Sequence, residues 1–511
     1  MLASVTSAGV YGIDAVPIEV EVDVGRGTHR FVIVGLPDAA VKESLDRVTT
    51  ALRNSGYHTR SGRLVINLAP ADLRKEGPCL DLPIAVGLLI ATQQLVAPDL
   101  AAYAVTGELA LDGRVRPVKG CLPMAVECRK QGLRGMVLSP ENAAEAAVVD
   151  GLDVIPVGTL VDAAGFFAGQ LPIQPFRTDI GEVFRRSLAK YDLDFSEVKG
   201  QEYAKRALTV AAAGGHNVLM IGPPGSGKTM LAQRLPTVLP LLSLEESLET
   251  TKVHSVAGIL GGGDALVAAR PFRSPHHTIS DAGLVGGGAV PRPGEVSLSH
   301  NGVLFLDEFP EFNRHTLEVL RQPLEDGTVT ISRAKTSIRY PARIMLVAAM
   351  NPCPCGYYTD PHKECRCTPS QIQRYMSRIS GPLLDRIDIH VEVPAAPYSE
   401  LRSDVPTLSS REMRDQVDAA RNTQTERFAG TGTFTNAGMS SRLVKAHCTL
   451  EAEAESVLEQ AMTSLALSAR AYTKILKVSR TIADLEGCAA IQGCHVAEVI
   501  QLRALDRGGV I

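Results

Sequence analysis

The sequence lacks any apolar run long enough to cross a bilayer. The best stretch, Ile84 to Ala91, holds eight residues, whereas a membrane-spanning helix needs about 20. The chain begins MLASVTSAGVYGIDAV, with no basic stretch leading into an apolar one, so we expect no secretory signal. From these absences we predict a cytoplasmic protein that has no membrane partner.

An excess of charge of one sign is missing as well. The 52 Lys and Arg residues stand against 56 Asp and Glu residues, which leaves a net charge of −4 and excludes a protein that coats nucleic acid with a basic surface. A local basic channel remains compatible with this balance. Ten cysteines in a chain of 511 residues without a secretory signal predict reduced thiols or metal ligands and not a disulfide framework.

Internal repeats and low-complexity blocks are also absent, and the alternation of strand and helix patterns divides the chain into four segments. Residues 1–170 have an α/β pattern, 171–194 form a polar, proline-containing linker, 195–394 have a second α/β pattern, and 395–511 are helical throughout. The fold class that follows is an α/β multidomain protein with an all-helical carboxyl-terminal domain. Three apolar runs in the second α/β segment predict buried strands: Asn217–Gly222, Gly302–Leu306 and Ile344–Met350.

A phosphate-binding loop lies between the first of these strands and a helix. Residues 222–229 read GPPGSGKT and fit the pattern G-x-x-x-x-G-K-[ST]. Its glycines let the backbone N–H groups converge on phosphate oxygens, Lys228 supplies positive charge, and the Thr229 hydroxyl ligates Mg²⁺. A glycine-rich turn that matches by chance is the alternative, and the strand-loop-helix context argues against it. The loop residues predicted to bind the nucleotide are Gly222, Pro223, Pro224, Gly225, Ser226, Gly227, Lys228 and Thr229.

A second apolar strand ends in an acidic pair, Asp307-Glu308. A carboxylate in this place coordinates the metal ion, for which Asp307 is the candidate, and a neighbouring carboxylate polarises the attacking water, for which Glu308 is the candidate. A hydrophobic run followed by two acidic residues is weak evidence by itself. Together with the phosphate-binding loop it predicts ATP and Mg²⁺ as cofactors.

Four of the ten cysteines fall within fifteen residues, as Cys353-Pro-Cys355 and Cys365-Arg-Cys367. Four thiolates suit tetrahedral Zn²⁺, and the loop 353–367 is therefore a candidate structural zinc site. Free or redox-paired thiols are the alternative, and His362 is a possible substitute ligand. A catalytic zinc is not expected, because nothing in the pattern suggests an open coordination position.

In this order, these features resemble the ComM/YifB-type family of magnesium-chelatase-like AAA+ ATPases. The resemblance covers nearly the whole chain and is carried by RSPHHTIS from Arg273, PRPGEVSLSHNGVLFLDEFPEF from Pro291 and NPCPCG from Asn351. It implies a homohexameric motor with a P-loop AAA+ core, a presensor-1 hairpin, a helix-2 insert and a helical lid. The family's best-studied members move branched DNA junctions while incoming single strands are integrated.

The resemblance also implies roles for three polar residues. Asn351, after the strand Ile344–Met350, matches sensor 1, which helps to place the attacking water. Arg386, in the string SGPLLDRID, matches the arginine finger that one subunit supplies to the nucleotide site of its neighbour. Arg374 and Arg378 are rival candidates. Arg470, at a helix start, matches the sensor 2 region and is expected to reach the γ-phosphate of ATP. The alternatives are an ordinary Asn-Pro turn for Asn351, a surface ion pair for Arg386 and an arginine common at helix starts for Arg470.

Two further segments resemble the insertions of this AAA+ branch. Residues 325–340 read as two β-rich runs joined near Ser332–Lys335, and the resemblance implies that Arg333 or Lys335 contacts DNA in the central channel. A solvated basic hairpin is the alternative. The glycine-rich segment 250–300 resembles the helix-2 insert. We interpret its adjacent His276 and His277 as packing or hydrogen-bonding groups, with ligand or DNA contact as the alternative.

The amino-terminal segment resembles the Lon-protease domain of the ribosomal-S5-like fold, through GPCLDLPIA from Gly77 and GELALDGRVRPVKG from Gly107. That protease uses a Ser-Lys dyad. Here the nucleophile position falls on Cys79 and the lysine position on Leu122, while Lys119 lies earlier in the turn. The dyad is incomplete, so we predict a domain for assembly or DNA contact without proteolysis.

Three functions follow, in order of preference. The first is an ATP-driven ring that translocates on DNA and promotes branch migration during recombination and uptake of single strands. The second is a chelatase- or MoxR-like remodeller acting on a protein or metallocofactor client. The third is Lon-like proteolysis. Stimulation of ATP hydrolysis by DNA favours the first, stimulation by a polypeptide the second, and digestion of casein the third.

Overall fold

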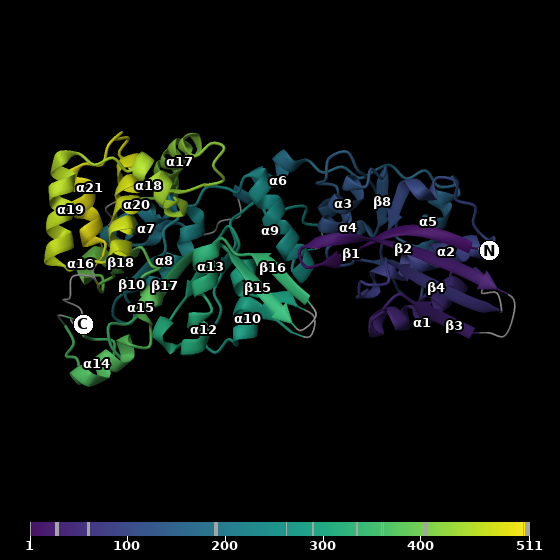
Figure 1. Cartoon of the computed structure of the whole chain (residues 1–511), viewed down its shortest axis with the longest axis horizontal. Helices are drawn as coiled ribbons and strands as arrows, with labels where there is room; N and C mark the ends of the chain where they lie inside the picture. Colours follow the sequence, from purple (N-terminus) through teal and green to yellow (C-terminus); the bar gives the residue numbers. More distant parts are fainter. Residues whose placement is uncertain are drawn as a thin grey trace. The chain divides into compact units, whose positions relative to one another are not determined.

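The chain folds into two compact units, each of which draws on separated parts of the sequence (Figure 1). Unit 1 comprises Met1–Arg186, Ser243–Ala268 and Ile338–Tyr340, and unit 2 comprises Ser187–Leu242, Ala269–Ser337 and Pro341–Ile511. The structure, a computed structural model, describes residues 2–25, 30–58, 62–188, 193–261, 263–288, 291–333, 336–358, 360, 362–402, 407–503 and 505.

Unit 1 opens with a four-stranded sheet in the order β1-β2-β4-β3. Its strands are β1 (Leu2–Tyr11), β2 (Asp14–Gly25), β3 (Arg30–Val34) and β4 (Arg63–Ala69). β2 runs antiparallel to β1 and β4, and β3 runs parallel to β4. Every second residue of β4 is buried, as expected of a sheet with one face on the core. That face is covered by α2 (Asp81–Ala91), which is buried at almost every position, and α1 (Ala39–Asn54) packs on α2.

A second, parallel sheet of unit 1 has the order β5-β8-β9. After β4 and α2, unit 1 contains β5 (Tyr103–Val105), β6 (Glu108–Leu109), β7 (Val115–Arg116), α3 (Cys121–Lys130), β8 (Gly135–Leu138), α4 (Pro140–Ala146), β9 (Asp153–Pro156), α5 (Leu160–Phe167), α6 (Ile180–Leu188) and α9 (Leu244–Ala257). Helix α9 packs on α3, where Gly120 N donates to Ser255 O over 3.2 Å and the Ser255 hydroxyl donates to the buried carboxylate of Glu145. The segment Ser243–Ala268 therefore belongs to unit 1, although it follows the phosphate-binding loop in sequence.

Unit 2 is built on a five-stranded parallel sheet in the order β11-β14-β17-β10-β18. The strands are β10 (Val218–Ile221), β11 (Phe272–Arg273), β14 (Val303–Leu306), β17 (Met345–Met350) and β18 (Ile389–Glu392). All residues of β10, β14 and β17 are buried, and these strands coincide with the three predicted apolar runs. Continuous apolar runs are typical of parallel strands covered on both faces.

The remaining elements of unit 2 surround this sheet and continue to the carboxyl terminus. Before β17 they are α7 (Glu202–Gly214), α8 (Lys228–Arg234), α10 (Asp281–Val285), β12 (Gly286–Gly287), β13 (Arg292–Pro293), α11 (Glu295–Leu298), α12 (Arg314–Glu318), α13 (Arg321–Asp326), β15 (Thr328–Arg333) and the two ends of β16 (Thr336–Pro341), whose residues Ile338–Tyr340 belong to unit 1. After β17 they are α14 (Pro369–Met376), α15 (Gly381–Leu384), α16 (Tyr398–Leu401), α17 (Ser410–Arg427), α18 (Ser441–His447), α19 (Ala452–Ser464), α20 (Ala469–Leu485) and α21 (Gly493–Gln501). β15 and β16 pair as a two-stranded sheet where the sequence predicted two β-rich runs. Among the described residues, no helix is long and apolar enough to cross a membrane.

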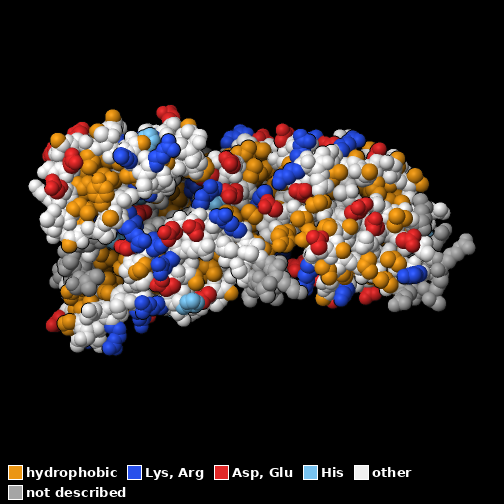
Figure 2. Space-filling view, in the orientation of Figure 1, with side chains coloured by type: hydrophobic (Ala, Val, Ile, Leu, Met, Phe, Trp, Pro, Cys, Tyr) orange, Lys and Arg blue, Asp and Glu red, His pale blue; other side chains and the backbone are white. Residues whose placement is uncertain are grey.

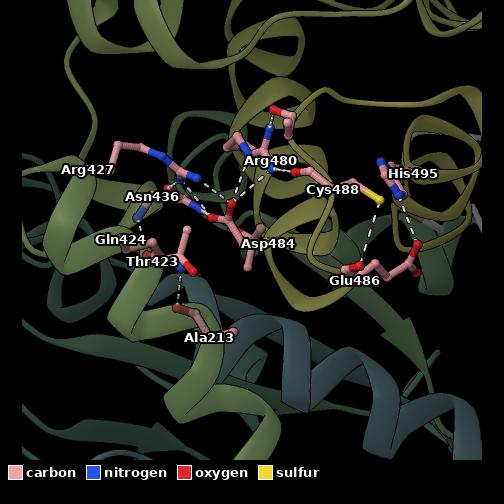
Figure 3. Close-up of polar contacts among 12 residues, drawn as sticks. Ala213, Thr423, Gln424, Arg427, Asn436, Arg480, Asp484, Glu486, Cys488 and His495 are labelled. Atoms are coloured by element: carbon pink, nitrogen blue, oxygen red, sulfur yellow. Dashed lines mark hydrogen bonds and ion pairs between the residues drawn. The ribbon is translucent and has the colours of Figure 1, made fainter.

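A buried polar network joins the carboxyl-terminal helices to α7 (Figure 3). The Asp484 side chain, fully shielded from solvent, accepts from Arg427 Nη1 over 2.8 Å, from Arg480 Nε over 3.0 Å and from Asn436 Nδ2 over 2.8 Å. Gln424 Nε2 donates to Ala213 O of α7 over 3.0 Å. Because α17 and α20 both contribute to this network and both pack on α7, the helical segment and the sheet form one compact unit.

Asp484→Asn should destabilise unit 2, since the buried guanidinium of Arg480 and the half-buried one of Arg427 lose their balancing charge while the size of the side chain is kept. Removing one partner of a buried ion pair costs about 3–5 kcal/mol. Urea unfolding followed by circular dichroism measures the loss. Asp415→Asn, at an exposed position of α17, is the matched control and should change the unfolding free energy by less than about 0.5 kcal/mol. Equal curves for the two variants would show that the network does not stabilise the unit.

Candidate functional site

The polar residues predicted to act on ATP follow three neighbouring parallel strands. Residues 222–227 follow β10, Asp307 follows β14 and Asn351 follows β17, and these strands are adjacent in the order β14-β17-β10. Since parallel strands end at the same edge, the three segments meet at the carboxyl edge of the sheet, where α/β proteins bind their ligands.

The phosphate-binding loop curls around the amine of Lys228. Lys228 Nζ donates to Gly222 O over 2.7 Å and to Pro223 O over 2.9 Å, and only 8% of the residue is exposed. Burial lowers the pKa of Lys228, and the charge of Asp307 partly offsets this effect. Gly222 is required by close approach, because a Cβ there would lie 2.0 Å from Val393 O. The loop therefore holds a positive charge where phosphate oxygens would enter.

Two oxygen ligands suited to Mg²⁺ lie beside this loop. Thr229 Oγ1 donates to Asp307 Oδ2 over 2.7 Å, and Asp307 Oδ1 accepts from the backbone N–H of Glu308 over 2.9 Å. A hydroxyl and a carboxylate at the β- and γ-phosphate end of the loop match the oxygen chemistry that Mg²⁺ prefers. The donor set therefore fits the predicted ion.

Asn351 lies in the same pocket. Its Oδ1 accepts from Lys228 Nζ over 3.3 Å, and the carbonyl of the preceding Met350 accepts from Gly222 N over 3.2 Å. The end of β17 and the start of the phosphate-binding loop are thus bonded to each other. A polar side chain held there is placed to contact either the γ-phosphate or the attacking water.

Glu308 has a partner that the sequence did not reveal. His277 Nδ1 lies 3.2 Å from Glu308 Oε2, and the His277 ring packs against the rings of His276 at 4.1 Å and Phe312 at 6.3 Å. Glu308 itself adopts a left-handed backbone conformation, with φ of +52°, which is uncommon for a residue with a side chain. The sequence predicted a packing or hydrogen-bonding role for the two histidines, but no spacing rule pointed to Glu308.

Arg386 and Arg470 lie away from this pocket. Arg386 precedes β18, and its carbonyl accepts from the side chain of Asn217, which precedes β10, over 2.9 Å. Arg386 is therefore at the amino edge of the sheet, about 13 Å from the carboxyl edge for strands of four residues. Its guanidinium bonds Glu325 and donates to Pro382 O over 2.6 Å, while Arg470 lies 3.6 Å from Asp385. The structure does not bring either arginine to the phosphate-binding loop of the same chain.

The rival arginines line a separate cavity of about 430 Å³. Arg374, Arg378 and Arg314 contribute to its wall, and Arg378 Nη1 donates to Glu311 Oε2 over 2.7 Å. These guanidiniums are outside the pocket formed by Lys228 and Asp307. Of the two candidate DNA contacts, Lys335 lies outside the described residues; Arg333 ends β15, and its side chain is not described.

The four clustered cysteines converge on one point. Their sulfurs all lie within 4.8 Å of one another. The Sγ–Sγ distances are 3.3 Å for Cys353–Cys355, 3.7 Å for Cys353–Cys365 and 3.6 Å for Cys355–Cys365. Sulfurs about 2.3 Å from a tetrahedral zinc are about 3.8 Å apart. Cys367 is the fourth member, and His362 is exposed and not part of the group. The cluster could therefore hold a metal ion.

One thiol of the cluster ionises readily. Desolvation raises the pKa of Cys355, but hydrogen bonds with the backbone of Tyr357 and Arg366 and with the Cys353 and Cys367 thiols outweigh it and lower the pKa to about 6. A thiolate is the form of cysteine that binds metal. None of the ten cysteines is part of a disulfide.

The amino-terminal residues compared with a protease dyad do not form one. Cys79 is buried, and burial raises its pKa to about 12. Leu122, at the lysine position, is fully buried, and its N–H donates to Glu145 over 2.8 Å. The Lys119 side chain lies against Gly258, and Lys75 donates to the carbonyls of Pro70 and Leu73. Among the described residues no amine hydrogen-bonds the Cys79 sulfur, which donates to Glu76 O over 3.8 Å, and burial disfavours its thiolate.

Comparison with known proteins gives a consistent family assignment. The model described as magnesium chelatase, subunit ChlI, matches residues 194–401, the one described as subunit ChlI of Mg-chelatase matches 20–142, and the one described as its C-terminal part matches 407–503. The chain is 45% identical over 508 residues to "Uncharacterized protein YifB" of Escherichia coli and 45% identical over 509 residues to "Competence protein ComM" of Haemophilus influenzae, covering 99% of this chain and 98% of each relative.

A more distant similarity covers part of the chain. The "Magnesium-chelatase 38 kDa subunit" of Cereibacter sphaeroides is 25% identical over 340 residues, which is 62% of this chain and 92% of that protein. The closer relatives match over nearly their whole length, and the three family models together follow both α/β segments and the helical segment. The chain therefore belongs to the ComM/YifB-type family of magnesium-chelatase-like AAA+ proteins.

Proposed function

We propose that the protein is an ATP-hydrolysing ring motor that translocates on DNA and promotes branch migration during recombination and uptake of single strands. The observation that carries the ATPase part is the convergence of Lys228, Thr229, Asp307 and Asn351 at one edge of the sheet. The DNA part is supported by the 45% identity to a relative named a competence protein and by the family resemblance of the β15–β16 hairpin.

In this proposal the chain binds and orients reactants and forms no covalent bond with phosphate. Residues 222–227 surround the phosphates and Lys228 neutralises oxygens at the β/γ end. Thr229 and Asp307 would hold Mg²⁺, which supplies further neutralisation of the transferred phosphoryl group. Glu308 polarises the attacking water, and Asn351 holds that water or the γ-phosphate in line.

The two displaced arginines support action between subunits. Arg386 and the Arg470–Asp385 pair lie at the edge of the sheet opposite the phosphate-binding loop, so neither is placed to serve its own nucleotide. We propose that both reach the γ-phosphate bound to a neighbouring copy, where a guanidinium stabilises charge on the equatorial oxygens. Closed rings are the usual outcome of such head-to-tail contacts, and the family resemblance favours a homohexamer.

One segment of unit 2, residues 277–287, contacts the hairpin at one end and Glu308 at the other. A Cβ on Gly286 would lie 2.7 Å from Ile331 Cδ1, so β12 touches β15. Asp281, five residues before Gly286, accepts from Thr316 Oγ1 over 2.5 Å, and His277 pairs with Glu308. Movement of the hairpin on DNA would therefore be transmitted through the segment 277–287 to the carboxylate that polarises water.

The other parts of the chain receive supporting roles. The four cysteines hold a structural zinc, the helices after Pro397 form the lid of the nucleotide pocket, and the Lon-like amino-terminal domain serves assembly or DNA contact without proteolysis. Contact with DNA needs only a local ring of basic side chains and not a positive net charge, because the electrostatic field that attracts phosphate is local. Figure 2 shows basic and acidic side chains interspersed on the face in view. We place the protein in the cytoplasm.

A second candidate is a remodeller with a protein or metallocofactor client. It is favoured by the 25% identity to the magnesium-chelatase 38 kDa subunit over 340 residues. The two functions share the nucleotide pocket and differ in what stimulates it.

The stimulus of ATP hydrolysis distinguishes the two functions. The ATPase rate of the full chain should rise several-fold when single-stranded or four-way-junction DNA is added. This stimulation should become smaller as the salt concentration rises, because salt screens the contacts between the protein and the DNA phosphates. Lys228→Ala and Glu308→Gln should each lower kcat at least about 100-fold. Arg333→Ala combined with Lys335→Ala should keep the basal rate and lose the stimulation.

Two results would contradict the DNA proposal. The first is an ATPase rate unchanged by every form of DNA and raised by a partner polypeptide, which would favour the remodeller. The second is a double hairpin variant that responds to DNA as the wild type does. If Lys228→Ala loses ATPase activity but the wild type does not respond to DNA, the nucleotide pocket is supported and only the proposed action on DNA is excluded.

A separate prediction concerns His277, which we expect to position Glu308. His277→Leu should lower kcat about tenfold with little change in KM for ATP, because the histidine contacts the carboxylate and not the nucleotide. His277→Asn, whose amide nitrogen can occupy the place of Nδ1, should recover most of the rate. His276→Leu is the matched control, since its Nδ1 bonds Thr278 and not Glu308. A wild-type kcat in His277→Leu would exclude the positioning role.

A further inference from the structure

The loop that carries the four cysteines turns directly onto the phosphate-binding loop. Gly356, between Cys355 and Tyr357, has φ of +86°, and a Cβ there would lie 2.5 Å from Pro224 Cδ and 2.7 Å from Pro224 Cγ. The backbone of Gly356 thus packs on the side chain of a residue in the phosphate-binding loop, at a distance that only glycine allows. The cysteine cluster and the nucleotide pocket share this contact.

The same loop also fixes Asn351 from the other side. Cys353 follows Asn351 by two residues and is fully buried, its carbonyl accepts from Gly356 N over 3.0 Å, and its sulfur accepts from Tyr358 N over 3.3 Å. Tyr375 on α14, the helix that follows Cys367, is buried, and burial raises the pKa of its hydroxyl to about 12 against an opposing effect of the Asn351 backbone. The contacts of Cys353 therefore hold the chain two residues beyond the residue that contacts Lys228.

Without an ion, four sulfurs within 4.8 Å have only weak thiol hydrogen bonds to hold them together. An ion that binds all four would cross-link positions 353, 355, 365 and 367, and so remove the freedom of the loop to lift Gly356 from Pro224. Thiolates favour soft or borderline cations such as Zn²⁺ over Mg²⁺. Metal binding would displace protons from the thiols.

We propose that a thiophilic divalent cation of the zinc class, held by the four cysteines, fixes Pro224 and Asn351 and thereby makes the affinity for ATP depend on occupancy of the metal site. This inference rests on the proposed binding of ATP at Lys228 and adds a second, distant determinant of it. The cation contacts neither the nucleotide nor the attacking water. It acts through Gly356 and through the backbone between Asn351 and Cys353.

The test measures metal content and nucleotide affinity separately on the purified full chain. Zinc is determined by elemental analysis, and the Kd of a fluorescent ATP analogue is measured with Mg²⁺ present and without turnover. Cys367→Ser should lose the zinc and raise Kd at least tenfold. Gly356→Ala should keep the zinc and also raise Kd, because it breaks the contact with Pro224 while sparing every thiol. Glu364→Gln, exposed in the same loop, should change neither quantity.

The variants separate the possible failures. Wild type stripped of zinc should regain its affinity when zinc alone is added back, whereas a damaged fold would not. The inference is overturned if Cys367→Ser loses its zinc with Kd unchanged, if Gly356→Ala binds the analogue as the wild type does, or if wild type free of metal binds it fully. Failure of the proposed ATP site is a different result: no binding by zinc-loaded wild type, or equal binding by Lys228→Ala.

Discussion

The parallel alignment of β10, β14 and β17 determines where chemistry can occur in unit 2. Because these strands point the same way, the loops that follow them meet at one edge, and that edge receives Lys228, Asp307 and Asn351. Because β18 is parallel to these strands, the segment that precedes it lies at the opposite, amino edge of the sheet, and this segment carries Arg386. One sheet therefore separates the residues proposed to hold the phosphates from the arginines proposed to trigger hydrolysis. We propose that this separation makes turnover depend on a neighbouring copy.

A buried charged cluster holds the amino edge in place. Asp388 accepts from Asn217 N over 3.1 Å and lies 3.0 Å from Lys474 Nζ on α20. Burial opposes the charge of Asp388, but Lys474 and His216 outweigh this effect and hold the pKa of Asp388 far below its usual range. Since Arg470 lies one helical turn before Lys474 on α20 and Arg386 lies two residues before Asp388, both arginines are anchored to the same cluster. The carboxyl-terminal helices thus help to position the candidate trigger residues as well as covering the sheet.

Local sequence patterns predicted the nucleotide pocket because each of its parts is a short apolar strand followed by a polar residue. The strands β10, β14 and β17 end within a residue of their predicted limits. The pairing of His277 with Glu308 could not be predicted, since His277 lies in an irregular segment whose course no periodic pattern determines. Nor did the sequence reveal that α9 packs on α3, because that contact joins residues more than one hundred positions apart. The spacing of the four cysteines predicted a cluster, but not its contact with Pro224.

The most direct test of the separation is complementation between two inactive variants. Lys228→Ala lacks the phosphate-binding amine but keeps Arg386, whereas Arg386→Ala keeps the nucleotide pocket but lacks the arginine. Each variant alone should hydrolyse ATP very slowly, and subunits mixed so that the two variants assemble together should regain a substantial part of the wild-type rate. A mixture no more active than its separate components, or an Arg386→Ala protein that alone hydrolyses ATP at the wild-type rate, would contradict the account.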